Sequence, residues 1–222
     1  MSQVLVIAPH PDDELLGCGG TLLRHIAEGD AVHWLIVSTM HQEHGFAPEA
    51  IQARREQIAA VARTVGFAAR HELELPATRL DTLPLAELVS RIGEVVSRVA
   101  PETLYLPYPG DIHSDHGVVF AAARGGCKWF RHPSVRRIYT YETPSESDLA
   151  LPPEGPGMPV NRYVDIEAYL EPKLAALSLY SSEMGRFPFP RSPEAIRALA
   201  RLRGAAAGCT AAEGFQLLKE IY

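Results

Sequence analysis

Cysteine is scarce in this sequence: only Cys18, Cys127 and Cys209 occur among 222 residues. An odd number of widely separated cysteines argues against a disulfide framework and favours reduced thiols. The segment after Met1 has no basic stretch ahead of its short apolar run, so it does not resemble a secretory signal peptide. We therefore expect a cytoplasmic protein.

Positive charge and long apolar runs are lacking as well. The chain has 21 Lys and Arg against 27 Asp and Glu, a net charge of −6, whereas nucleic-acid binding needs a basic face. No apolar stretch approaches the ~18 residues of a membrane-spanning helix. Hydrophobic residues still make up 46% of the chain, enough for a sizeable core. We expect no nucleic-acid partner and no membrane span, and the sequence leaves a homo-oligomer open.

Apolar runs alternate with helical patterns along the first 142 residues. The apolar runs predict strands at 4–8, 31–38, 71–76, 103–107 and 136–142. The periodic segments predict helices at 15–28, 51–65 and 85–99 and within 116–130. This alternation indicates an α/β fold, a Rossmann-like, doubly wound, mostly parallel sheet with helices on both faces in three layers.

We expect one domain over residues 1–222, with a core at 1–142 and an elaboration at 143–222. The stretch 143–160 is rich in Pro, Ser and Gly and is expected to form an ordered loop over the site. Helices near 171–179 and 193–203 follow, and the final segment fits a strand or a helix. "LGCGG" (16–20) lacks the spacing of a nucleotide-binding loop and predicts close helix–sheet packing.

Two clusters of His and Asp come directly after predicted strands. "PHPDDE" (9–14) follows the strand at 4–8, and "DIHSDH" (111–116) follows the strand at 103–107. In an open parallel sheet, ligands bind beyond the carboxyl ends of the strands, where the strand order reverses. In the common order 3-2-1-4-5 the first and fourth strands flank that point, so we expect the two clusters to face each other.

Imidazoles and carboxylates gathered in one place suit a divalent metal ion. Zn²⁺ is the expected ion, with Fe²⁺ or another divalent ion as the alternative. A catalytic zinc takes three protein ligands and one open position, which His10, Asp13 and either His113 or His116 would provide. The ion would also turn the repulsion among adjacent carboxylates into attraction. The alternative is that Asp12 and Asp13 only cap the following helix and that the histidines are ordinary loop residues.

The two clusters also carry a resemblance. "APHPDDELLGCGGTL" with "DIHSDH" resembles the LmbE-like, or PIG-L, superfamily of zinc-dependent N-deacetylases, whose hallmarks are an (A/P)HPDDE box and an HxDH box. The segments "RREQIAAVARTVGF", "KLAALSLYSSEM" and "RGAAAGCTAAEGF" are similar to further family signatures in the same order. The resemblance implies a metal-dependent hydrolase that removes the N-acetyl group of an amino sugar or sugar conjugate with a metal-activated water.

The resemblance also implies roles for particular residues. It implies three metal ligands: His10, Asp13 and His116. It implies Asp12 as the general base and a charged His113 that stabilises the oxyanion and helps the amine to leave, with Asp115 orienting the His113 ring. The small-molecule substrate would be an N-acetylated sugar.

Four further residues are candidates for substrate binding: Arg54, Glu14, Asp111 and Tyr108. Arg54 lies on the second predicted helix, where the family suggests a contact with a phosphate or hydroxyl; the alternative is a solvated surface charge. Some family members have a Tyr two residues before the HxDH box, where this chain has Asp111, and Tyr108 is close in sequence. The loop 185–193, which contains Arg191, either packs or shapes a substrate lid.

Other functions stay open at this point. They are an amidase acting on another sugar- or thiol-conjugate amide, a metal-dependent phosphoesterase, and a sugar-binding protein with a structural metal. Two-metal phosphoesterases usually need more ligands than the two clusters offer. A structural site has no need of a base beside it, so Asp12 argues for turnover.

Overall fold

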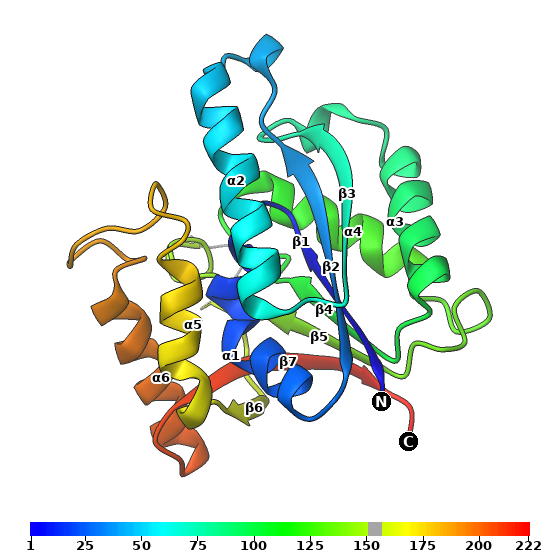
Figure 1. The fold of residues 1–222 in the computed structure, drawn as a ribbon. Coiled ribbons are helices and arrows are strands. Elements are labelled where there is room, and N and C mark those ends of the chain that lie inside the picture. The colour runs from blue at the N-terminus through cyan, green and yellow to red at the C-terminus, as the bar shows by residue number, and fades with distance from the viewer. Residues whose placement is uncertain (151–156) are drawn as a thin grey trace.

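A seven-stranded mixed sheet forms the middle layer of the protein (Figure 1). The computed structural model describes residues 1–150 and 157–222. The strand order is β3-β2-β1-β4-β5-β7-β6, which confirms the predicted order 3-2-1-4-5. Two strands are added at one edge: β7 runs antiparallel to β5, and β6 runs antiparallel to β7. The strands are β1 (Gln3–Ala8), β2 (Ala31–Thr39), β3 (Ala69–Pro76), β4 (Thr103–Pro107), β5 (Arg137–Tyr141), β6 (Arg162–Asp165) and β7 (Ala212–Glu220).

Helices cover both faces of this sheet, as predicted. They are α1 (Asp13–Ala27), α2 (Pro48–Val65), α3 (Leu85–Val99), α4 (Ser114–Gly126), α5 (Leu170–Leu177) and α6 (Pro193–Ala207). Helix α2 begins three residues before the predicted start, because Pro48 is well suited to the first helical position. The final segment is a strand. Of the predicted loop 143–160, residues 151–156 lie outside the described residues. No helix in the described part of the chain is long and apolar enough to cross a bilayer.

Strand β1 is buried on both faces, which explains its unbroken apolar run. Val4, Val6 and Ala8 face a core that includes residues of α1, α2, α5 and α6. Leu5 and Ile7 face a second core that includes residues of α3 and α4. Each fully buried aliphatic side chain of this size contributes roughly 1.5–3 kcal/mol. Because β1 is an interior strand that pairs with β2 on one side and β4 on the other, the start of the loop at its carboxyl end is fixed in position.

Helix α1 packs unusually close to its neighbours. A Cβ atom on Gly17 would meet the ring of Tyr141 at 2.3 Å, and one on Gly20 would meet Ile166 at 2.8 Å. The helix is interrupted at Cys18, whose φ of −139° is not helical. These contacts confirm that "LGCGG" serves close packing. They also fix the start of α1, where the "DDE" acids lie.

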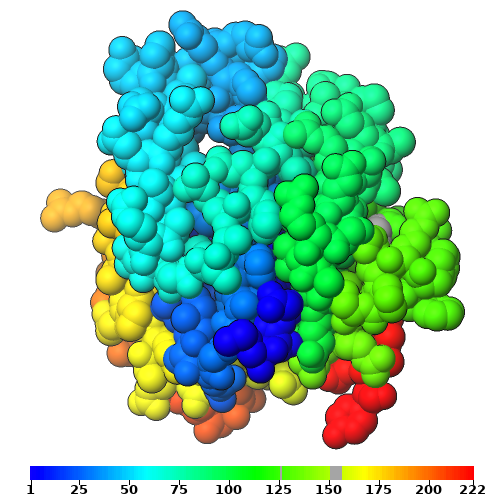
Figure 2. All heavy atoms as spheres, turned by 45° about the vertical axis from the view of Figure 1, so that its right-hand side comes forward, coloured from blue at the N-terminus to red at the C-terminus, as the bar shows by residue number. Residues whose placement is uncertain are grey.

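The carboxyl ends of β1 and β4 lie side by side, because the two strands pair in parallel. The loops that follow them therefore meet at one edge of the sheet. Both chain termini lie at the opposite end of the molecule: the dark blue and red residues are low in the view of Figure 2, and the β2–α2 segment is at its top.

Candidate active site

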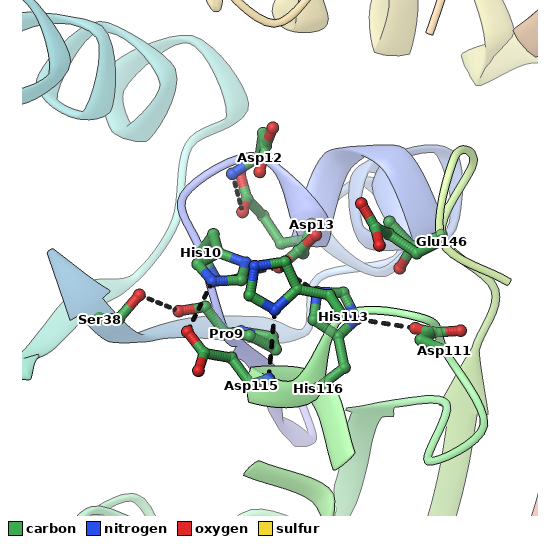
Figure 3. A network of polar contacts seen from close by, with 12 residues as sticks. Pro9, His10, Asp12, Asp13, Ser38, Asp111, His113, Asp115, His116 and Glu146 are labelled. Carbon is green, nitrogen blue, oxygen red and sulfur yellow. Dashed lines mark hydrogen bonds and ion pairs between the residues drawn. The ribbon is translucent and has the colours of Figure 1, made fainter. Parts of the chain in front are cut away.

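The turn from β1 into α1 is strained at Asp12. This residue has a φ of 139° and a ψ of −28°, a conformation that costs a non-glycine residue about 1–3 kcal/mol. The backbone N–H of Asp12 donates to the Glu14 carboxylate at 3.0 Å, and its C=O accepts from Leu15 and Leu16 at 3.0 and 2.9 Å. The Asp12 side chain makes no capping hydrogen bond, so the capping alternative fails for this residue. The turn sends the Asp12 and Asp13 carboxylates in different directions (Figure 3).

Asp13 lies between two histidines. One of its carboxylate oxygens is 3.3 Å from Nδ1 of His10 and 3.3 Å from Nε2 of His116. His10, Asp13 and His116 each offer a ligand atom, and these atoms lie within 4.8 Å of one another. The structure thus brings together the three predicted metal ligands from the two loops.

The other nitrogen of each ring is held by a second carboxylate. Nε2 of His10 lies 3.1 Å from Asp115, and Nδ1 of His116 lies 2.7 Å from Asp111. Metal-binding histidines in proteins almost always have their second nitrogen fixed in this way. The donor set of His10, Asp13 and His116 therefore fits a divalent ion.

A second group, His10, His113 and Asp115, also has possible ligand atoms within 4.8 Å of one another. Its carboxylate is already engaged, because Asp115 accepts the backbone N–H groups of Thr78 at 2.7 Å and Leu80 at 3.1 Å as well as His10. The set that contains Asp13 is thus the better one for a metal.

Without a metal, the two histidines carry protons. Burial lowers the pKa of His10, but hydrogen bonds to Asp115 and Asp13 outweigh it and raise that pKa to about 9. Burial likewise opposes the charge on His116, but Asp13 and Asp111 raise its pKa to about 10. Burial would raise the pKa of Asp13, and the two histidines hold it well below its usual value instead. The carboxylates of this cluster therefore stabilise positive charge at the two histidines.

Asp115 contacts the His113 ring through its backbone and not through its carboxylate. The Asp115 carboxylate binds His10, and it is the Asp115 backbone N–H that donates to Nδ1 of His113, at 3.1 Å. Nδ1 is thus an acceptor, which places the proton of the ring on Nε2 and leaves the ring neutral. Burial, then the charge of His10, lower the pKa of His113. A neutral His113, not the expected charged one, faces the site.

A cavity of about 200 Å³ opens beside the cluster. His10, Asp12 and His113 line it, so the candidate base and one metal-binding histidine meet the same space. Many ligand pockets measure roughly 300–1,000 Å³, so this one is narrow. Four further charged side chains form part of its wall: Arg54, Glu146, Glu183 and Arg191.

Arg54 alone among the four predicted substrate-binding residues lines this cavity. It is a buried residue, not a solvated charge: its guanidinium donates to the C=O of Pro11 at 3.0 Å, pairs with Glu183 and lies 5.5 Å from the Tyr180 ring centre. Arg54 therefore supports the turn that carries Asp12.

The other three residues lie outside the cavity lining. Glu14 is fully buried, where it accepts from the Asp12 backbone and from the Tyr180 hydroxyl at 3.1 Å. Both carboxylate oxygens of Asp111 are engaged, by His116 and Ser147. The Tyr108 hydroxyl donates to the C=O of Gly157 at 3.3 Å. Glu14 and Asp111 instead contact and position neighbouring site residues.

Sequence reasoning missed Glu146 and Glu183 and gave Arg191 no specific role. Glu146 follows the carboxyl end of β5, so the strand-end rule that found the HxDH box could have found it too. Glu183 and Arg191 come from the segment between α5 and α6; the sequence left the loop 185–193 open between packing and a substrate lid, and no signal marked Glu183.

The fold and this donor set define a metal-binding α/β enzyme. Comparison of the sequence with known protein families identifies the family. The PIG-L family model, described as GlcNAc-PI de-N-acetylase, matches residues 5–125, more than half of the chain. The chain therefore belongs to the PIG-L family, as its two boxes predicted, and is a hydrolase of the N-deacetylase class.

Two proteins of related sequence and one solved structure are similar to most or all of this chain. The uncharacterized deacetylase YaiS of Escherichia coli is 28% identical over 184 residues, 81% of this chain and 90% of its own. The 1D-myo-inositol 2-acetamido-2-deoxy-alpha-D-glucopyranoside deacetylase of Saccharomonospora viridis is 25% identical over 238 residues, 82% of this chain and 85% of its own. The crystal structure of a conserved protein from Thermus thermophilus has a TM-score of 0.78 at 28% identity, covering 100% of this chain and 97% of its own.

Proposed function

We propose that this protein is a zinc-dependent N-deacetylase whose substrate is an N-acetylated amino sugar or a conjugate of one. The observation that carries the proposal is the meeting of two features in one cavity. His10 belongs to the metal-binding set, and Asp12 lies outside that set but lines the same space. A structural metal site has no use for this neighbouring carboxylate, whereas hydrolysis does.

The His₂–carboxylate set suits zinc with an open coordination position. A bound zinc ion supplies a Lewis acid that polarises the amide carbonyl and lowers the pKa of water. His10, Asp13 and His116 would hold it. Asp111 and Asp115 keep the two rings in the orientation that this requires.

Asp12 is proposed to take a proton from the attacking water as general base. The same carboxyl group then returns this proton to the amide nitrogen as the C–N bond breaks, which leaves the free amine and acetic acid, and the acid ionises to acetate. His113 is proposed to donate a hydrogen bond from Nε2 to the developing oxyanion. This nitrogen has no other hydrogen-bond partner within the described residues.

Charged side chains in the wall of the cavity support a sugar as the substrate. Carboxylates accept hydrogen bonds from hydroxyls, and Glu146 and Glu183 stand at the cavity. The relative from Saccharomonospora viridis, by its name, deacetylates an acetamido sugar linked to inositol.

An acetate-release assay tests this proposal. Protein stripped of metal and reloaded with Zn²⁺ or Fe²⁺ is offered N-acetylglucosamine, an N-acetylglucosaminyl inositol, an N-acetylated thiol conjugate and a sugar phosphate. We expect acetate from an acetamido sugar, and none from Asp12→Asn protein of equal metal content. Phosphate release without acetate, or turnover restricted to the thiol conjugate, would contradict it.

A further inference from the structure

Arg191 joins three segments that are distant in sequence. Its guanidinium donates to the Asp12 carboxylate at 2.9 Å, to Glu146 at 3.1 Å and to Glu183 at 3.3 Å. Its Nε atom donates to the Ser145 hydroxyl at 2.8 Å. A guanidinium group presents its donors in a fixed plane, so these contacts determine its orientation. Arg191 is thus held over the cavity by its partners.

The backbone of Arg191 is anchored as well. The next residue, Ser192, is buried and caps helix α6 by accepting the N–H of Ala195 at 3.1 Å. Pro193 then occupies the first helical turn. A side chain that starts beside a capped helix and ends among fixed partners is well placed to orient another group.

The contact with Asp12 is one-sided. Arg191 donates to Oδ2 of Asp12, and no hydrogen bond reaches Oδ1 from residues 1–150 or 157–222. Asp12 is only 4% exposed, and it borders the cavity together with His10 and His113. One oxygen is therefore fixed while the other stays available on the cavity side.

We infer that Arg191 is the positioning residue that holds the Asp12 carboxylate in the orientation needed to take a proton from water. This inference rests on the proposed role of Asp12 as general base. Arg191 touches neither the reacting atoms nor the metal-binding residues, and it acts through Asp12. Ser145, Glu146 and Glu183 in turn fix Arg191.

Steady-state kinetics of Arg191→Ala, with zinc content measured in each preparation, tests the inference. A displacement of a catalytic group by about 1 Å can lower the reaction rate about 100-fold. We expect kcat to fall about 10–100-fold with KM little changed and zinc content unaltered, and we expect free guanidinium added at millimolar concentration to restore part of kcat. Arg186→Ala is the matched control, because Arg186 lies on the same loop but is exposed. It should retain the wild-type kcat.

Arg191→Lys and Ser145→Ala keep the inference testable if Arg191→Ala does not fold. The lysine keeps the charge but not the planar fork, so kcat should fall by less than in Arg191→Ala. Ser145→Ala removes one partner of Arg191, and its smaller effect should vanish in the Arg191→Ala background.

Two results would overturn the inference. A rise in KM at unchanged kcat would make Arg191 a substrate contact, and full activity of folded Arg191→Ala would leave it without a role. Failure of the proposed function is recognised separately, since the zinc-loaded wild-type protein would then release no acetate from an acetamido sugar, whatever the Arg191 variants do.

Discussion

Nε2 of His10 lies 3.1 Å from Oδ2 of Asp115. The acid of the HxDH box thus reaches across to the histidine of the other box. The same carboxylate accepts the N–H groups of Thr78 and Leu80, which follow β3. One carboxylate therefore joins the ends of three strands and leaves Nδ1 of His10 directed at Asp13.

Asp115→Asn is expected to weaken zinc binding about 10–100-fold, the usual cost of losing a partner of a metal-binding histidine. The amide has only one acceptor oxygen for three donors, so His10 loses its fixed orientation. Competition with a chelator measures the affinity, and Asp81→Asn at an exposed position of the neighbouring segment serves as the control. Unchanged affinity with reduced kcat would mean that Asp115 acts through His113 after all.

The two acids of the turn are expected to separate in function. Asp13→Ala should lose metal and activity together. Asp12→Ala should retain about one equivalent of metal and lose activity by about 10²–10⁴-fold, as is typical for a general base. Elemental analysis beside acetate release distinguishes the two outcomes. Equal loss of metal in both variants would make Asp12 a ligand.

The meeting of the two boxes could be predicted from sequence because it depends on few facts. "VLVIA" and "TLYLP" are apolar at nearly every position, which predicts strands buried on both faces, and parallel neighbours end at one edge. The boxes follow these strands without an intervening element. Local pattern and topology were therefore sufficient to place His10, Asp13 and His116 together.

The partners of each side chain could not be predicted, because they depend on rotamers and on distant segments. Asp115 was assigned to His113, its near neighbour in sequence, yet its carboxylate binds His10, 105 residues away. Arg191 meets Asp12 across 179 residues. No periodicity or spacing records such contacts. Family resemblance identified the residues of the boxes but not the hydrogen bonds that orient them.

Metal-free and metal-loaded protein are expected to respond oppositely to pH. The folded pKa values of His10 and His116, about 9 and about 10, lie above the ordinary 6.5. Their contribution to the stability of the metal-free protein is therefore fully present below pH 6.5 and lost as pH rises through 9 to 10. Zinc must displace these protons, so its affinity should increase over the same range.

Denaturant unfolding of chelator-treated and zinc-saturated protein across this pH range measures both trends. The free energy of unfolding of metal-free protein should fall with pH, while the stabilisation added by zinc should grow. His116→Ala should flatten the first trend, because one of the two groups is gone. A metal-free protein whose stability rises from pH 6.5 to 10 would contradict the protonated cluster.

The backbone strain at Asp12 predicts that glycine is more stable than alanine at this position. Its φ of 139° is accessible to glycine without strain but costs alanine about 1–3 kcal/mol. Glycine loses roughly 0.5–1 kcal/mol more than alanine in conformational entropy on folding. Asp12→Gly should therefore be more stable than Asp12→Ala by about 1 kcal/mol, although both lack the carboxylate and are inactive. Metal-free protein in a denaturant titration provides the comparison.

The same pair of substitutions at Asp13, the first residue of α1, should show the opposite order, because alanine is favoured there. Alanine proving the more stable at both positions would mean that position 12 is unstrained and that the Asp12 carboxylate is not held in place by its backbone.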